Sequence, residues 1–142
     1  MMFKTVLLAV DVNDLEGAKR PAETAVRLAA ADGADLHVMN VVPDFGMALV
    51  GSFFSPDHNA QIMKEAKAAL EAWAKENLKD VANVTLQVDQ GTVYEEVLKE
   101  SETVKADVIV VGAHKSQLKD YLIGPNAARI SRHAKQSVFV VR

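Results

Sequence analysis

The fold is decided most clearly by residues 108–130, which read VIVVGAHKSQLKDYLIGPNAARI. The stretch opens with a run of β-branched apolar residues, as expected of a strand that helices cover on both faces. Gly112 follows this strand, and Gly124 stands just before a helical pattern. The succession of strand, loop and helix predicts one step of a parallel βαβ sheet.

The same alternation continues along the rest of the chain in both directions. Strands are predicted at residues 5–10, 35–42, 83–88, 107–111 and Ser137–Val141, and helices at 18–31, 57–78, 93–104 and 126–133. Pro21 fits the opening turn of its helix, and Gly33 is a natural left-handed cap behind that helix. Right-handed crossovers then predict an α/β fold, a doubly wound five-stranded parallel sheet in the order 3-2-1-4-5 with helices on both faces. We expect residues 1–142 to form a single domain.

Composition excludes several classes of function. Apolar residues make up 49% and charged residues 25%, a globular balance, and the net charge of −3 argues against coating a nucleic acid. The chain has no cysteine, which excludes disulfides and thiolate chemistry. The first apolar run ends at Asp11 without the features of a signal peptide, and no stretch is long enough to span a bilayer. We therefore expect a cytoplasmic protein without a membrane partner.

The segment 45–56 is unusual because it is apolar yet rich in glycine and proline. The simpler interpretation is a loop that packs over the edge of the sheet. The alternative is a flap over a ligand or a partner surface.

A doubly wound sheet binds its ligands at the carboxyl ends of the strands, where the winding direction reverses. Asp11 follows the first strand at such a position. Its carboxylate can accept a hydrogen bond from an exocyclic amine or a ribose hydroxyl, or it can form an Asx turn or a helix cap. The pattern alone does not decide between these two roles.

The glycines after the fourth strand predict an anion cradle. Glycine lets the backbone turn sharply near Gly112 and Gly124, and the helix that follows offers outward N–H groups at Asn126 and Ala127. His114 lies in the same loop, where it either contacts a phosphate or braces the loop. The other histidines, His37, His58 and His133, show no metal-ligand spacing and are assigned structural or surface roles.

The motifs of well-known catalytic and phosphate-binding sites are missing. No GxxxxGK[ST], GxGxxG, GxSxG or HExxH motif is present, and Lys115 with Ser116 matches only the tail of the first of these. We predict no catalytic residue and no dedicated metal site.

The chain resembles the universal stress protein family over essentially its whole length. The resemblance rests on TVLLAVDVND, LHVMNVVP, VDQGTVYEEVLKESETVKADVIVVGAHK and YLIGPNAARISRHAKQSVFVVR. It implies a fold of the adenine nucleotide α-hydrolase type and a stress-response regulatory module that binds ATP, or ADP or AMP, with little or no hydrolysis. It also implies a homodimer through the edge strand Ser137–Val141.

The resemblance further implies a set of nucleotide contacts. Asp11 would contact the adenine or the ribose, and Val41 would contact the adenine through its backbone. The residues implied to line the phosphates are Gly112, His114, Lys115, Gly124, Pro125 and Asn126. Magnesium is possible, although no dedicated site is indicated.

Two positions depart from the family pattern G-x2-G-x9-G-[S/T]. Lys115 replaces the second glycine in a loop that is one residue shorter, and Pro125 replaces the serine or threonine. Proline removes a hydroxyl and a backbone N–H, a loss of about 1–3 kcal/mol where both groups would meet a phosphate. The alternative function is therefore a nucleotide-free interaction protein that keeps the fold and the dimer edge. An enzyme or flavin binder is a weaker option, because the first strand is not followed by a Ser/Thr-rich phosphate loop.

Overall fold

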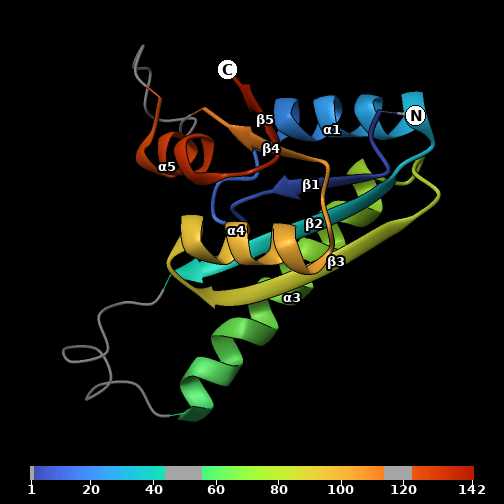
Figure 1. Cartoon of the computed structure of the whole chain (residues 1–142). Coiled ribbons are helices and arrows are strands. Elements are labelled where there is room, and N and C mark those ends of the chain that lie inside the picture. Colours follow the sequence, from blue (N-terminus) through green and yellow to red (C-terminus); the bar gives the residue numbers. More distant parts are fainter. Residues whose placement is uncertain (1, 44–55, 114–122) are drawn as a thin grey trace.

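The computed structural model describes residues 2–43, 56–113 and 123–142, and every structural statement below concerns these residues. Five parallel strands form one sheet in the order β3-β2-β1-β4-β5, which confirms the predicted topology (Figure 1). The strands are β1 (Thr5–Ala9), β2 (Asp35–Pro43), β3 (Val84–Gly91), β4 (Val108–Gly112) and β5 (Ser137–Val141). The helices are α1 (Lys19–Asp32), α3 (Pro56–Asn77), α4 (Val93–Thr103) and α5 (Pro125–His133). The observed bounds differ from the predicted ones by a few residues, most at the carboxyl end of β3.

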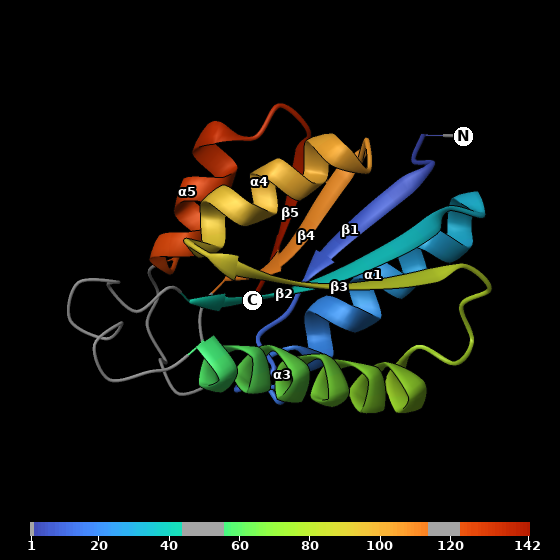
Figure 2. The same ribbon diagram turned by 90° about the horizontal axis from the view of Figure 1, so that it is seen from below.

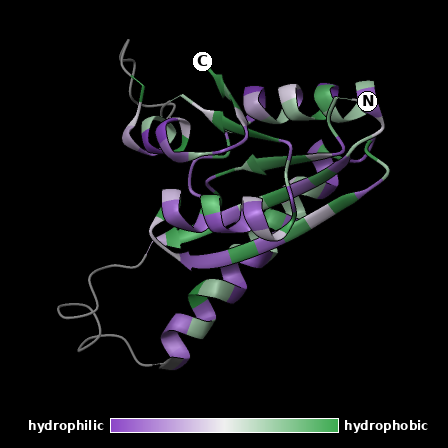
Figure 3. Ribbon diagram, viewed as in Figure 1, coloured by the Kyte–Doolittle hydropathy of each residue, from purple (hydrophilic) through white to green (hydrophobic). Residues whose placement is uncertain are grey.

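The helices cover the two faces of the sheet in pairs, with α1 and α3 on one face and α4 and α5 on the other (Figure 2). Successive residues of a strand point to opposite faces. Val6 and Leu8 of β1 therefore enter the core beneath α1 and α3, whereas Leu7 enters the core beneath α4 and α5. β1, in the middle of the sheet, is coloured as hydrophobic in Figure 3, and the helices show hydrophilic residues on their outer faces.

The carboxyl ends of α1 and α4 are closed by the same backbone arrangement with different residues. Gly33 follows α1 with a φ of 63°, and the N–H of the next residue donates to Ala29 at 2.8 Å. Behind α4, Lys105 takes up a φ of 55°, and the next N–H donates to Ser101 at 2.9 Å. The left-handed cap predicted at Gly33 is confirmed, and the left-handed conformation of Lys105 carries the steric penalty that glycine avoids.

Two carboxylates close the backbone at the amino ends of the strands. Asp32 Oδ2 accepts the N–H of Phe3 at 2.7 Å. Asp107 Oδ2 accepts the N–H groups of Lys4 and Thr5 at 2.7 Å and 3.0 Å. The entry into β1 is thereby joined to the end of α1 and to the start of β4.

The histidines that the structure describes lie on secondary structure, as expected. His37 is buried in β2, and its Nε2 lies 2.7 Å from Glu100 Oε2 of α4. His133 is the exposed last residue of α5, and His58 lies near the start of α3. The bond of His37 to Glu100 joins a strand to a helix and gives this histidine a structural role.

Candidate nucleotide-binding site

The carboxyl ends of β1, β2 and β4 meet at one edge of the sheet. β1 pairs with β2 up to Ala9 and Met39, and with β4 up to Leu8 and Val110. After β1 the chain turns to α1 on one face, and after β4 it continues to α5 on the other face (Figure 2). The winding therefore reverses between β1 and β4, which is where doubly wound sheets hold their ligands.

Asp11 forms an Asx turn at this edge. Its Oδ1 accepts the N–H of Asn13 at 2.9 Å, and its backbone carbonyl accepts the N–H of Asp14 at 2.9 Å. The turn orients the half-buried carboxylate and uses one of its two oxygens. Among the residues that the structure describes, no donor bonds Oδ2. The two roles considered for Asp11 are thus compatible, because the turn leaves one oxygen for a ligand.

The backbone of Val41 is left open where β1 departs from β2. The odd-numbered residues of β2 direct their N–H and C=O groups toward β1, as shown by the bonds of Asp35 to Lys4 and of Val10 to Met39, each 2.9 Å. The next rung of the ladder would consist of two hydrogen bonds, from the N–H of Val41 to the carbonyl of Val10 and from the N–H of Val12 to the carbonyl of Val41. That rung is absent, and within the described part of the chain neither polar backbone group of Val41 has a partner.

The side chain of Asn40 binds the N–H that would otherwise close this part of the ladder. Its Oδ1 accepts the N–H of Val12 at 3.1 Å, so this N–H does not reach the carbonyl of Val41. Asn40 is only 2% exposed. Asn40 was not predicted as a site residue, although a polar residue in the otherwise apolar run VMNVV is a usable signal, because a buried amide needs a hydrogen-bond partner.

The glycine-bounded loop after β4 is closed at its base by one residue. Ala113 donates its N–H to Val141 of β5 at 2.7 Å, and its carbonyl accepts the N–H of Gly124 at 2.6 Å. The chain therefore leaves the sheet and returns to it at Ala113, which is 1% exposed. The predicted contacts His114 and Lys115 lie outside the described residues. Gly112, the last residue of β4, stands directly before this junction.

The start of α5 offers fewer donors than a typical helix N-terminus. Gly124 is the N-cap residue, and its N–H is already bonded to Ala113. Pro125 follows as the first helical residue and has no N–H. The first bond within the helix runs from Ala128 to Gly124 at 3.0 Å. The donors left over are the N–H groups of Asn126 and Ala127, together with the positive end of the helix dipole.

No group of three or more histidine, aspartate or glutamate side chains within 2–43, 56–113 and 123–142 is arranged to hold a metal ion. None of the helices there is long and apolar enough to cross a membrane.

An acidic turn after β1 and a loop leading into a helix N-terminus after β4 define the class of doubly wound α/β proteins with a ligand site at the switch point. Within this class, the chain belongs to the universal stress protein family, whose model matches residues 2–142. Universal stress protein G of Escherichia coli O157:H7 is 29% identical over 143 residues, which cover 99% of this chain and 100% of that protein.

Solved structures show the same fold. The hypothetical protein MJ0577 aligns with a TM-score of 0.83 and 24% identity, over 99% of this chain and 96% of that one. The universal stress protein of Archaeoglobus fulgidus in complex with dAMP aligns with a TM-score of 0.70 and 17% identity, over 100% of both chains. The predicted fold and family are confirmed.

Proposed function

We propose that this protein is a stress-response regulatory module that binds an adenine nucleotide, ATP or else ADP or AMP, at the carboxyl edge of β1, β2 and β4. The observation that carries the proposal is the open backbone of Val41 beside the turn that holds Asp11. Adenine presents an exocyclic amine that donates and a ring nitrogen that accepts, and Val41 offers a carbonyl and an N–H in return. Asp11 Oδ2 would then accept a hydrogen bond from the ribose or from the adenine amine.

The phosphates would lie between Gly112 and the start of α5. The N–H groups of Asn126 and Ala127 would bind them, Gly124 would allow close approach, and Pro125 would contribute shape without a donor. We assign His114 and Lys115 to the same phosphate site, as cationic or hydrogen-bonding side chains. Any magnesium would be held largely by the phosphates. With no base assigned to activate water, hydrolysis would be slow or absent.

The Archaeoglobus fulgidus protein, which has the same fold, was solved in complex with dAMP, and this supports an adenine nucleotide as the ligand. We assign the protein to the cytoplasm.

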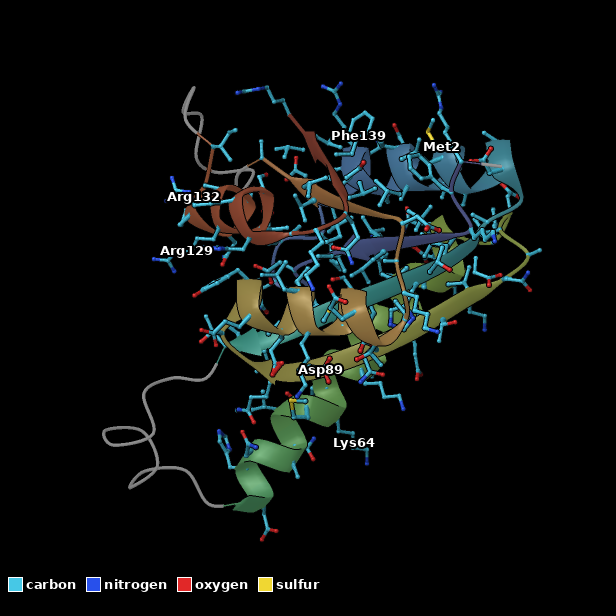
Figure 4. All side chains as sticks on the ribbon, viewed as in Figure 1. Met2, Lys64, Asp89, Arg129, Arg132 and Phe139 are labelled. Carbon is cyan, nitrogen blue, oxygen red and sulfur yellow. The ribbon has the colours of Figure 1, made fainter. Side chains whose placement is uncertain are left out.

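We further propose a homodimer through β5. This strand is at the edge of the sheet, and among the described residues it pairs with β4 alone. Phe139 is 46% exposed on it, an unusual position for a phenylalanine (Figure 4). Pairing with the β5 of a second copy would cover both the free backbone groups and this ring. Replacing Phe139 with lysine should give monomers in sedimentation experiments, and a dimer of unchanged affinity would exclude this interface.

Nucleotide carried through purification provides the first test. The protein is denatured by heat, the supernatant is chromatographed for ATP, ADP and AMP, and the melting temperature is then measured with millimolar ATP. We expect bound nucleotide or a clear rise in melting temperature, because a ligand that binds only the folded state stabilises it. If neither is found, the nucleotide proposal fails.

A nucleotide-free interaction protein is the second candidate. It is favoured by Pro125 and by the bond of Gly124 to Ala113, which together remove two donors from the phosphate site. For this candidate we expect the dimer without any response of the melting temperature to ATP.

A further inference from the structure

Asn40 is a buried polar residue whose place in β2 is not explained by the core around it. Its neighbours on the same face, Val38 and Val42, are buried apolar residues, and Asn40 itself is 2% exposed. Burying an amide costs free energy unless it is hydrogen-bonded, and valine would fit a buried strand better. The one hydrogen bond that the Asn40 side chain makes among the described residues is from the N–H of Val12 to its Oδ1, at 3.1 Å.

This hydrogen bond lies where the ladder between β1 and β2 stops. The ladder is regular up to the bond of Val10 to Met39. If the ladder continued, its next hydrogen bond would run from the N–H of Val12 to the carbonyl of Val41. Asn40 Oδ1 accepts this N–H instead, and within residues 2–43, 56–113 and 123–142 neither backbone group of Val41 is paired.

We infer that Asn40 is a positioning residue that holds the rung at Val41 open for the base of the nucleotide. The inference rests on the proposed nucleotide binding. Asn40 does not contact the ligand in this role. It acts through Val12, and it also fixes the start of the turn in which Asp11 is oriented. Selectivity for adenine would then depend on a side chain that points into the core.

A purely structural role for Asn40 predicts a different outcome. In that case its loss would lower stability and weaken every ligand of the site to the same extent. If Asn40 holds the rung open, its replacement by valine lets Val12 bond to Val41. Adenine recognition is then lost while the fold keeps its stability, since a ladder hydrogen bond replaces the one to Asn40.

ATP and ITP form the probe pair that separates these outcomes. ITP has the same ribose and phosphates as ATP, but the donor and acceptor of its base edge are exchanged, so it mismatches the Val41 groups. We expect the wild-type protein to prefer ATP by about tenfold or more, the value of one to two hydrogen bonds. Asn40→Val should lose most of that preference, because its affinity for ATP falls while its affinity for ITP stays the same. Asn40→Asp keeps the acceptor oxygen and should retain most of the preference.

Asn83→Val is the matched control. Asn83 lies at the amino edge of the sheet, where its carbonyl accepts the N–H of Leu36 at 2.9 Å and its side chain is exposed. The same chemical change there should leave the ATP to ITP ratio unaltered. Melting temperatures of all variants, measured without ligand, report whether an effect on binding is an effect on folding.

A scalar coupling across the hydrogen bond tests the geometry without any nucleotide. In the wild-type protein we expect the amide nitrogen of Val12 to couple to the side-chain carbon of Asn40. In Asn40→Val the coupling should move to the carbonyl carbon of Val41. A missing coupling to Asn40 in the wild-type protein overturns the inference at its first step.

The binding outcomes separate the inference from the function on which it rests. If the wild-type protein binds neither nucleotide, the proposed function and the inference fall together. If it binds ATP and ITP equally, nucleotide binding is supported, but recognition of adenine by the Val41 backbone is refuted. If Asn40→Val keeps the ATP preference of the wild-type protein, the role of Asn40 alone is refuted.

Discussion

The amino and carboxyl edges of the sheet differ in whether their backbone groups have hydrogen-bond partners within the described residues. At the amino edge, the N–H groups of residues 3–5 are all taken by the carboxylates of Asp32 and Asp107. At the carboxyl edge, the backbone groups of Val41 and the N–H groups of Asn126 and Ala127 have no partner among the described residues. Backbone groups without a partner in the protein can bond to water or to a ligand. Under the proposed function, the amino edge stabilises the fold and the carboxyl edge binds the ligand.

The largest expected effect is on stability, at Asp107. Asp107→Ala removes the acceptor of the N–H groups of Lys4 and Thr5 at once and should lower the free energy of unfolding by about 2–3 kcal/mol. Urea denaturation measures this loss. Asp35→Ala is the control, because Asp35 is an exposed residue of the same edge and its replacement should change stability by about 0.5 kcal/mol or less. Folded Asp107→Ala protein should bind ATP as the wild type does. A loss of ATP affinity in the folded variant would contradict the assignment of ligand binding to the carboxyl edge alone.

The matching change at the carboxyl edge is Asp11→Ala, which should act on binding. Removing the carboxylate is expected to weaken the binding of ATP by about tenfold to hundredfold, because a charged acceptor for a hydroxyl or amine of the ligand is lost. The loss of the Asx turn to Asn13 should cost about 1 kcal/mol of stability or less. Calorimetric titration measures the affinity. Asp11→Asn keeps the turn without the charge, and we expect it to lie between the wild type and Asp11→Ala. Unchanged ATP affinity in both variants would assign Asp11 to the turn alone.

A gain of function is expected at Pro125. Pro125→Ser restores both the N–H and the hydroxyl at the first position of α5, and ATP affinity should rise by about threefold to tenfold. Pro125→Ala restores the N–H only and should give part of the gain. Adenosine has no phosphate and serves as the control ligand, because its affinity should not change. If the affinity of adenosine rises as much as that of ATP, the gain does not come from a phosphate contact.

Much of this organisation follows from sequence patterns, and the rest depends on contacts between distant residues. Apolar runs predicted the strands, the topology rules for doubly wound sheets predicted their order, and Gly33 predicted the cap behind α1. The open rung at Val41 was not predictable as geometry, because it depends on which acceptor the N–H of Val12 meets across 28 positions of sequence. The bond between Ala113 and Gly124 was missed for the same reason, since two backbone groups without distinctive side chains meet there. The proposed contacts at His114 and Lys115 stay predictions.

The smallest expected effect concerns Lys105, where the amino edge itself departs from an ideal backbone. Lysine gives no local signal for a left-handed conformation, yet the cap behind α4 forces one upon it at a φ of 55°. Lys105→Gly should therefore raise the free energy of unfolding by about 0.5–1 kcal/mol, because glycine adopts this conformation without the steric penalty. Lys105→Ala removes the charge but keeps the strain, so we expect almost no change from it. Equal stabilisation in both variants would point to charge as the cause. If only the glycine variant is stabilised, Lys105 marks a strained position at the edge that otherwise stabilises the fold, and ATP affinity should be the same in all three proteins.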